Sequence, residues 1–207
     1  MSQFDISSPK HCAKKGFHFN FLNKKLFKIL FTLILSIISL ILLIWFILHP
    51  TKPQFILQQT DIYQLNFSSP HILNSSIIIT LEARNANQRV GIYYDELQAS
   101  VSYKGQQITL HTLIPPFYQS PQDSNLLSAS LVGNALPVAP SIGYQLERDE
   151  QTGMIILVLK IDGRLRWKVS SWVSGRYRMN VNCVAILRLD PTSPLSSKQG
   201  TQCSTNI

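Results

Sequence analysis

The stretch Arg164-Leu165-Arg166-Trp167-Lys168-Val169 decides the fold, because cationic and apolar side chains alternate along it without interruption. A period of two places successive side chains on opposite faces of a β-strand, so Leu165, Trp167 and Val169 should face a core. Residues 176–183 repeat the pattern, with apolar side chains and Cys183 at one set of positions and Arg or Asn at the other. Two half-buried strands, separated by a turn at Ser174-Gly175, are therefore predicted.

Further runs extend this prediction along the chain. Alternation predicts strands at residues 77–84 and 97–104, an apolar run predicts one at 126–132, and a turn at 104–106 leads into a partner strand at 107–110. Residues 154–161 are almost all apolar, which is typical of a strand covered on both faces. Asp162-Gly163 then predicts a tight turn or a bulge.

Proline-containing segments interrupt the strands and are expected to be irregular. Residues 115–123 are predicted to form a loop, and Pro137 and Pro140 mark a second irregular crossing. No convincing amphipathic helix follows the N-terminal region. Several short strands separated by turn signals predict an all-β fold, namely a β-sandwich.

A single long apolar segment precedes the predicted sandwich. Residues Ile29–Leu48 contain no charged side chain. A helix rises about 1.5 Å per residue, so this segment is about 30 Å long, which matches the hydrocarbon thickness of a bilayer. Its few hydroxyl groups can bond carbonyls one turn back, and Trp45 lies near one end, where an indole ring favours the headgroup level. A transmembrane helix is predicted.

The flanking charges predict the orientation of this helix. Six lysines and one aspartate precede residue 29, whereas only His49 and Lys52 follow the segment closely. An excess of Lys marks the cytoplasmic side, so we expect a single-pass type II protein whose C-terminal domain is extracellular. A cleaved signal peptide is the main alternative, but the apolar run is long and no Ala-x-Ala-like site follows it.

These features divide the chain of 207 residues into four regions. We expect a basic cytoplasmic tail at 1–28, a signal-anchor at 29–48, a β-sandwich at 49–190 and a loosely held Ser/Thr-rich tail at 191–207. The formal net charge of the chain is +8, and most of it comes from the lysines that precede the predicted transmembrane helix. Anionic lipids would attract these lysines. The moderate basic excess of the remaining domain does not favour nucleic-acid binding.

Two covalent modifications are expected on the extracellular side. Cys183 and Cys203 lie beyond the membrane, where disulfides persist, whereas Cys12 lies in the cytoplasmic tail. A disulfide between Cys183 and Cys203 would tie down the C-terminus and add about 2–4 kcal/mol to the free energy of unfolding. Spacing alone does not establish the geometry of this bridge. Asn66-Phe67-Ser68 and Asn74-Ser75-Ser76 predict glycosylation at Asn66 and Asn74.

No pattern in the sequence predicts catalysis. The histidines lack metal-ligand spacing, and there is no phosphate-binding loop or nucleophile elbow. Asp95-Glu96 and Asp149-Glu150 are adjacent in sequence, so each pair would point to opposite faces of a strand; we interpret them as solvated turn acids. We therefore expect a non-enzymatic protein without a cofactor or a bound metal.

Five cations fall on the outward positions of the two strands predicted from residues 164–169 and 176–183. If those strands pair, the cations share one sheet face, which could bind anionic lipid headgroups, an acidic wall polysaccharide or an acidic partner. The alternative is an ordinary solvated face whose charge is relieved by neighbouring acids. The residues are Arg164, Arg166, Lys168, Arg176 and Arg178.

Several motifs together resemble the plant NDR/HIN-like proteins, which carry a late-embryogenesis-abundant group 2 domain. Residues 85–95 read Asn-Ala-Asn-Gln-Arg-Val-Gly-Ile-Tyr-Tyr-Asp, and residues 115–119 read Pro-Pro-Phe-Tyr-Gln. Residues 163–169, the Ser-Gly-Arg-Tyr at 174–177 and the Val-Asn-Cys at 181–183 follow in the family's order. The family usually has Pro where this chain has Ala86 and Val184, which puts local loop shapes in question.

The resemblance implies an immunoglobulin- or fibronectin-III-like sandwich at the plasma membrane, often at plasmodesmata. It also implies a link to pathogen defence, senescence or transport between cells, a turn at Gly91 and a core position for Trp167. We expect a cell-surface interaction module in defence or cell-to-cell signalling; a structural membrane or wall tether at plasmodesmata or under stress is the alternative. Expected partners are the bilayer, an unidentified protein and a second copy of the chain.

Overall fold

The computed structural model describes residues 21–48, 50–68, 72–188 and 195–207. The chain forms two compact units, one containing the N-terminal helix and the other extending from Pro50 to Ile207. The N-terminal residues 1–20, which include most of the predicted cytoplasmic tail, lie outside the described residues.

The helix α1 (Phe21–Leu48) contains the predicted apolar segment and begins eight residues before it. Lys24, Lys25 and Lys28 extend it because lysine is a good helix former. The window Lys24–Leu43 has a mean hydropathy of 2.7 and none of it is buried, so α1 is long and apolar enough to cross a membrane. Thr32 donates its hydroxyl to the Ile29 carbonyl at 2.9 Å, as expected for a hydroxyl in an apolar helix.

The second unit is a sandwich of two antiparallel sheets, which confirms the predicted fold class. One sheet has the order β11-β1-β2-β7; the other has the order β12-β10-β8-β3-β4, with β5 and β6 paired to β3 and β9 paired to β8. The strands are β1 (Gln54–Ser68), β2 (Ile72–Arg84), β3 (Gly91–Tyr103), β4 (Gln106–Gln107), β5 (Thr112–Ile114), β6 (Phe117–Gln119), β7 (Ser124–Pro137), β8 (Met154–Val169), β9 (Trp172–Val173), β10 (Tyr177–Arg188), β11 (Leu195–Gln202) and β12 (Ser204–Asn206).

The core lies between the sheets and follows the alternation of the sequence. Every second residue of β2 from Leu73 to Ala83 is buried, and β10 repeats this pattern from Met179 to Leu187. Leu165 and Trp167 of β8 are also buried, at 0% and 8% exposure. Burial of one face per strand therefore explains why a period of two dominates the sequence.

The outer face of β8 differs from the prediction. Residues 154–161 were expected to be covered on both faces, yet Met154 and Ile156 are 47% and 44% exposed. Ile156 lies opposite Ile186 of β10, and Val158 lies opposite Val184. The apolar run therefore forms cross-strand pairs on an outer face.

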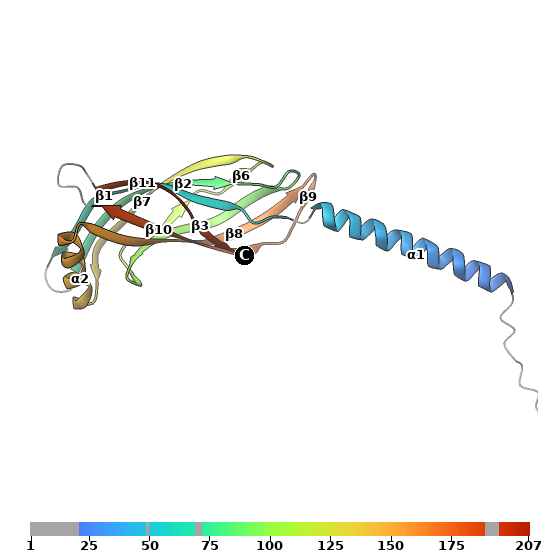
Figure 1. Cartoon of the computed structure of the whole chain (residues 1–207), viewed down its shortest axis with the longest axis horizontal. Coiled ribbons are helices and arrows are strands. Elements are labelled where there is room, and N and C mark those ends of the chain that lie inside the picture. The colour runs from blue at the N-terminus through green and yellow to red at the C-terminus, as the bar shows by residue number, and fades with distance from the viewer. Residues whose placement is uncertain (1–20, 49, 69–71, 189–194) are drawn as a thin grey trace, which may run out of the picture. The chain divides into compact units, whose positions relative to one another are not determined.

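Three irregular segments of the prediction contain regular structure. The predicted loop at 115–123 contains β6, which pairs with β3 through Ile92↔Gln119 and Tyr94↔Phe117. The tail after residue 190 forms β11 and β12, which extend one sheet each by pairing with β1 and β10. The crossing at Pro140 begins a helix, α2 (Pro140–Gln151), whose buried residues are Ile142, Gly143 and Leu146. Figure 1 shows α2 at one end of the sandwich and β9 at the other.

The helix α2 also changes the interpretation of Asp149-Glu150. Asp149 lies in this helix rather than in a turn, and its carboxylate lies 2.8 Å from the Lys104 ammonium. The Tyr103 hydroxyl donates to the same carboxylate oxygen at 2.7 Å. The hydrogen bonds from Lys104 and Tyr103 lower the pKa of Asp149, so this acid holds α2 against the β3–β4 turn.

Candidate functional site

The five predicted cations gather on the outer face of the larger sheet, which we call the tyrosine–arginine face. It consists of Tyr93 and Asp95 of β3, Glu96, Tyr118 and the five cations. β8 and β10 pair, which was the condition for a shared face, and Arg164 lies directly opposite Arg178. The sequence therefore predicted which cations come together, but it did not predict which side chains lie among them.

Asp95 neutralises the centre of this face. Arg166 donates Nε and Nη2 to its two carboxylate oxygens at 2.7 and 3.0 Å. The Nε of Arg176 lies 3.8 Å from the same carboxylate, which is only 17% exposed. This bidentate pairing raises the pKa of Arg166. Asp95 is thus an ion-pair partner in a strand, and the interpretation of it as a turn acid is wrong.

A bulge in β3 brings a second acid to the face. The register between β3 and β8 shifts between Asp95 and Gln98, where Glu96 has a φ of 52°. Glu96 Oε2 then lies 3.5 Å from Arg164 Nη1. The bulge was predicted at Asp162-Gly163, but these residues continue β8 and the extra residue lies in the partner strand. A Cβ at Gly163 would come within 2.5 Å of Leu97, so Gly163 makes room for the bulge.

Two tyrosines hold the fourth cation. Lys168 Nζ donates to the Tyr93 hydroxyl at 3.3 Å and lies 4.9 Å from the ring centroid of Tyr118. The hydrogen bond to Tyr93 raises the pKa of Lys168. The two rings lie 4.6 Å apart, and a Cβ at Gly91 would come within 2.8 Å of the Tyr118 ring. Gly91 begins β3 and admits this ring, so the turn expected there is not present.

Arg178 is the fifth cation, and it forms no ion pair with any residue that the structure describes. It lines a cavity of about 280 Å³ together with Arg164, Asn180, Gln98, Glu96 and Asp162. Two guanidinium groups and two carboxylates share this space, so its formal charge is balanced. The cavity can hydrogen-bond a polar or carboxylate-bearing group, but its positive charge is largely compensated.

The two predicted glycosylation sites face each other across strands β1 and β2. Asn66 pairs in register with Asn74. Asn66 is exposed, whereas Asn74 is half-buried and its Oδ1 accepts a hydrogen bond from the Ala135 backbone at 2.8 Å. Asn66 also lines a cavity of about 580 Å³ beside α2, together with Phe67 and Tyr144. Asn66 is thus the more accessible of the two acceptors.

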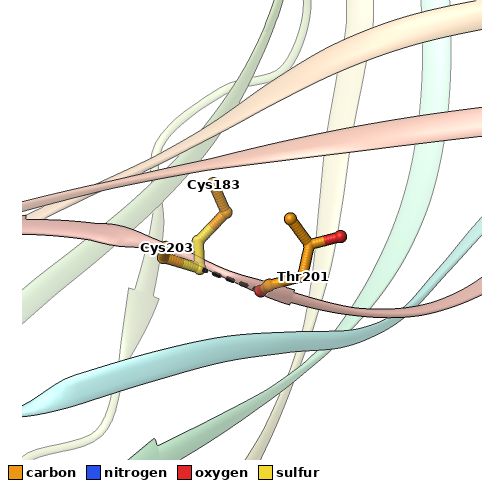
Figure 2. The surroundings of a disulfide bond; sticks show 3 residues. All are labelled: Cys183, Thr201 and Cys203. Atoms are coloured by element: carbon orange, nitrogen blue, oxygen red, sulfur yellow. Dashed lines mark hydrogen bonds between the residues drawn. A yellow bond between two sulfur atoms is a disulfide. The ribbon is translucent and has the colours of Figure 1, made fainter.

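Cys183 and Cys203 form a disulfide in the structure, with their Cα atoms 4.4 Å apart. Figure 2 shows Cys203 beside Thr201, whose carbonyl oxygen lies 3.9 Å from the Cys203 sulfur. A disulfide sulfur carries no proton, so this is a contact rather than a donated hydrogen bond. The Cys203 backbone donates to the Phe55 carbonyl at 2.8 Å, and the bridge therefore lies where both sheets meet the C-terminal strands.

Among the described residues, no three His, Cys, Asp or Glu side chains are grouped to hold a metal. The absence of an enzymatic activity and of a cofactor remains a prediction.

Comparison with known proteins identifies the family. A family model described as late embryogenesis abundant protein matches residues 80–184. NDR1/HIN1-like protein 26 of Arabidopsis thaliana is 53% identical to this chain over 213 aligned residues. The alignment covers 100% of this chain and 100% of the relative. The chain belongs to the NDR1/HIN1-like family.

Two other NDR1/HIN1-like relatives from Arabidopsis thaliana are also similar. Protein 12 is 43% identical over 156 residues, covering 75% of this chain and 74% of the relative, and protein 1 is 40% identical over 180 residues, covering 86% of each. A solution structure from the same organism matches with a TM-score of 0.36 and 14% identity over 68% of this chain and 83% of that chain.

The motifs that carried the NDR1/HIN1-like resemblance form a buried polar network. Tyr94, fully buried, donates its hydroxyl to Gln119 at 3.0 Å, and Gln119 Nε2 donates to the Ala83 carbonyl at 2.6 Å. Burial raises the pKa of Tyr94, which therefore remains a neutral hydrogen-bond donor. Phe117 stacks on the Tyr94 ring at 4.6 Å. Sequence reasoning missed these roles, because nothing in the spacing of the motifs shows that they meet.

Asn85 and Asn87 of the first motif connect the domain to the chain that precedes it. Asn87 Oδ1 accepts from the Thr51 backbone at 2.7 Å, and Asn87 Nδ2 donates to the Thr51 carbonyl at 2.9 Å. Asn85 Nδ2 donates to the carbonyls of Val90 and Ser120 at 2.8 and 3.0 Å. We call the short segment between α1 and β1 the neck. In this NDR1/HIN1-like chain the neck residue Thr51 is thus fixed to the sandwich.

Proposed function

We propose that this protein is a membrane-anchored, non-catalytic interaction module of the plant cell surface that acts in defence or cell-to-cell signalling. In this proposal α1 stays in the plasma membrane with its N-terminus in the cytoplasm, and the sandwich is extracellular. The observation that carries the proposal is α1 itself, whose window Lys24–Leu43 is apolar and unburied. A cleaved signal sequence would have the same composition, so retention of the helix is the point to test.

Two features support the orientation and the short tether. Lys24, Lys25 and Lys28 lie at the start of α1, whereas its last turn carries no basic residue. An excess of Lys on one flank favours a cytoplasmic location for that flank. The described domain begins at Pro50, and Asn87 fixes Thr51 to it, so little free chain separates the end of α1 from the sandwich.

The tyrosine–arginine face is the surface that we propose binds the partner. Tyr and Arg are enriched in the parts of protein interfaces that contribute most to affinity. Tyr118 is 39% exposed, and Arg178 is exposed and unpaired among the described residues. The ligand in this proposal carries acidic groups, as an acidic wall polysaccharide or an anionic lipid does, and Arg164 and Arg178 bind it.

Retention of the anchor is tested on protein isolated from plant membranes. We expect an intact mass that includes residues 1–48 and resistance to extraction by alkaline carbonate. Protease added to intact protoplasts should digest the sandwich and spare an N-terminal epitope. A mature protein that begins near Pro50, or an N-terminal epitope that is digested from outside, would contradict the proposal.

The binding face is tested with the full chain in nanodiscs of neutral lipid, titrated with polygalacturonate or with vesicles that contain phosphatidylserine. Asp95→Asn removes one negative charge beside Arg166 and Arg176, so affinity for an anionic ligand should rise about fivefold, which is the effect of about 1 kcal/mol at contact distance. Asp61→Asn makes the same charge change in β1 of the other sheet and should have no effect. Combined Arg164→Gln and Arg178→Gln should weaken binding. Equal affinities for all variants would exclude this face.

A structural tether is the second candidate, and the hydrogen bonds between Thr51 and Asn87 support it because they attach the first residues of the domain firmly to the sandwich. Deleting residues 2–20 separates the two candidates while keeping the three lysines that orient α1. If the shortened chain restores pathogen resistance in a plant that lacks the gene, tethering is sufficient. If resistance is lost while the protein still reaches the cell surface, the cytoplasmic tail has a signalling role.

A further inference from the structure

Trp172 is held in an exposed position by a fixed hairpin. Its side chain is 62% exposed, whereas Trp167 in the preceding strand is 8% exposed. Trp172 pairs in register with Val169, and the Ser174 backbone donates to the Trp167 carbonyl at 2.9 Å, so the hairpin has regular ladder bonds. The Ser174 hydroxyl also accepts from the Trp167 backbone at 2.9 Å. The indole N–H of Trp172 has no hydrogen-bond partner among the described residues.

This hairpin lies at the end of the sandwich where the chain enters from α1, which we call the neck end. The neck residue Thr51 is bonded to Asn87, and the loop that contains Asn87 runs into Gly91 at the start of β3. Gly91 pairs with Lys168, one residue before Val169 and the hairpin. Residues 51, 85–91 and 168–173 therefore lie at one end, and Figure 1 shows β9 there.

The charges of the two ends of the sandwich differ. Lys52, Arg84 and Arg89 at the neck end are exposed, and none has an ion-pair partner among the described residues. At the opposite end α2 carries the three acids Glu147, Asp149 and Glu150 with one arginine, Arg148. Asp123, whose carbonyl accepts from the Asn85 backbone, is an acid at the neck end. The three cations outnumber it, so the end that the chain reaches first after the apolar helix is cationic and presents an exposed indole ring.

We propose that the neck end is a second membrane contact, in which Trp172 inserts at the headgroup level and Lys52, Arg84 and Arg89 face anionic lipid. This inference rests on the proposed function, because it requires that α1 remains in the bilayer. Indole rings favour the membrane interface, where the ring is partly desolvated and the N–H can bond to a headgroup. Cations close to an anionic lipid headgroup are attracted to it, and salt screens this attraction.

Such a contact would give the domain two points of attachment to the bilayer. With α1 alone, the sandwich could rotate about the neck; with the hairpin also docked, its tilt is restricted. The tyrosine–arginine face would then be presented at a set angle to the membrane, which deepens the proposed role as a binding module. A protein partner that covers Trp172 is the competing occupant, and the test distinguishes it from lipid.

The test uses the full chain with Trp45→Phe in nanodiscs that contain phosphatidylserine and lipid brominated near the headgroup. Bromine quenches nearby indole fluorescence, and the signal of Trp172 is the difference between this protein and the same protein with Trp172→Phe. We expect about half of that signal to be lost, because an indole at the headgroup level lies close to the bromine. The matched control moves the indole to the other end by adding Tyr144→Trp to Trp172→Phe; Tyr144 is 75% exposed on α2, and its replacement should not be quenched.

The charge contribution is tested with a second pair of variants. Lys52→Glu with Arg89→Glu should reduce the quenching of Trp172 in anionic nanodiscs to the level seen in neutral ones. Arg148→Glu on α2 makes the same type of change at the opposite end and should leave the quenching unchanged.

The outcomes separate the two proposals. If the chain is retained by alkaline-washed membranes but Trp172 is quenched no more than the Tyr144→Trp reporter, the membrane contact is wrong and the anchor stands. If the chain is released from the membrane, the anchor is wrong and the second contact falls with it. If Trp172 is protected from quenching only when other plant surface proteins are present, a protein occupies the hairpin and the lipid proposal is overturned.

Discussion

Removing the disulfide is expected to destabilise the sandwich by about 3 kcal/mol. Cys183 and Cys203 are replaced together by Ala, so that no unpaired thiol remains. The bridge spans a sequence separation of 20 residues, and the entropy of closing such a loop in the unfolded chain gives the figure of about 3 kcal/mol. In the folded double variant β11 should stay paired with β1, and the residue 203 backbone should stay bonded to Phe55, so the loss arises in the unfolded chain and is realised in full.

The assay is urea unfolding of the full chain in detergent micelles, followed by the fluorescence of the buried Trp167. A slope of about 1–3 kcal/mol per M converts the loss into a midpoint lowered by about 1–3 M. Wild-type protein in a reducing agent should match the double variant. Cys12→Ala is the matched control and should leave the midpoint unchanged.

Thiol counting first establishes that the wild-type chain has a single free cysteine. If it does, and the double variant still unfolds at the wild-type midpoint with an unchanged slope, then closing this loop does not restrict the unfolded chain as reasoned. If three thiols are free, the bridge itself is absent.

The remaining predictions concern single side chains, each measured by the urea midpoint. Asn87→Ala should cost about 1–2 kcal/mol, because the hydrogen bonds of the buried amide to Thr51 are lost. Gly91→Ala should cost about 1 kcal/mol, because the new Cβ displaces the partly exposed Tyr118 ring. Gly105→Ala is the control: its new Cβ meets no neighbouring atom, so it reports only the strain of an alanine at positive φ. The pKa of Asp149 is lowered from 3.8, so its ion pair stabilises the fold above that value and the contribution is lost as pH falls through the lowered pKa. The difference between wild type and Asp149→Asn should therefore shrink on acidification, and a constant difference would contradict the assignment.

The sandwich could be predicted because burial of one sheet face imposes a period of two on the sequence. Residues 164–169 and 177–183 behave as expected apart from Tyr177, which lies at the start of β10 and is 47% exposed. The apolar run at 154–161 was misjudged for a physical reason. Continuous apolarity does not distinguish a strand covered on both faces from one that carries apolar cross-strand pairs on its outer face.

The helix and the last strands could not be predicted from local signals. The residue before α2, Ala139, makes no side-chain capping bond, and only Ile142, Gly143 and Leu146 of this helix are buried. Its one start signal is Pro140 in the first turn, a residue that also marks loops, and it has no broad apolar stripe. The strands β11 and β12 are rich in Ser, Thr and Gln because edge strands can pair through backbone bonds without an apolar face.

The cations of the candidate site were predictable, but their partners were not. Alternation placed Arg164 and Arg166 on one face, and strand pairing added Arg178. Asp95 reaches the same face only because of the register between β3 and β8, and Glu96 only because of a bulge with positive φ. Register and bulges depend on contacts between distant segments, so no local reading of the sequence contains them.

The placement of the final strands has a consequence for biosynthesis. β11 completes the edge of one sheet and β12 completes the edge of the other, so both sheets depend on residues 195–206. Any polypeptide that ends before residue 195 would leave β1 and β10 as open edges, which cellular quality control can recognise.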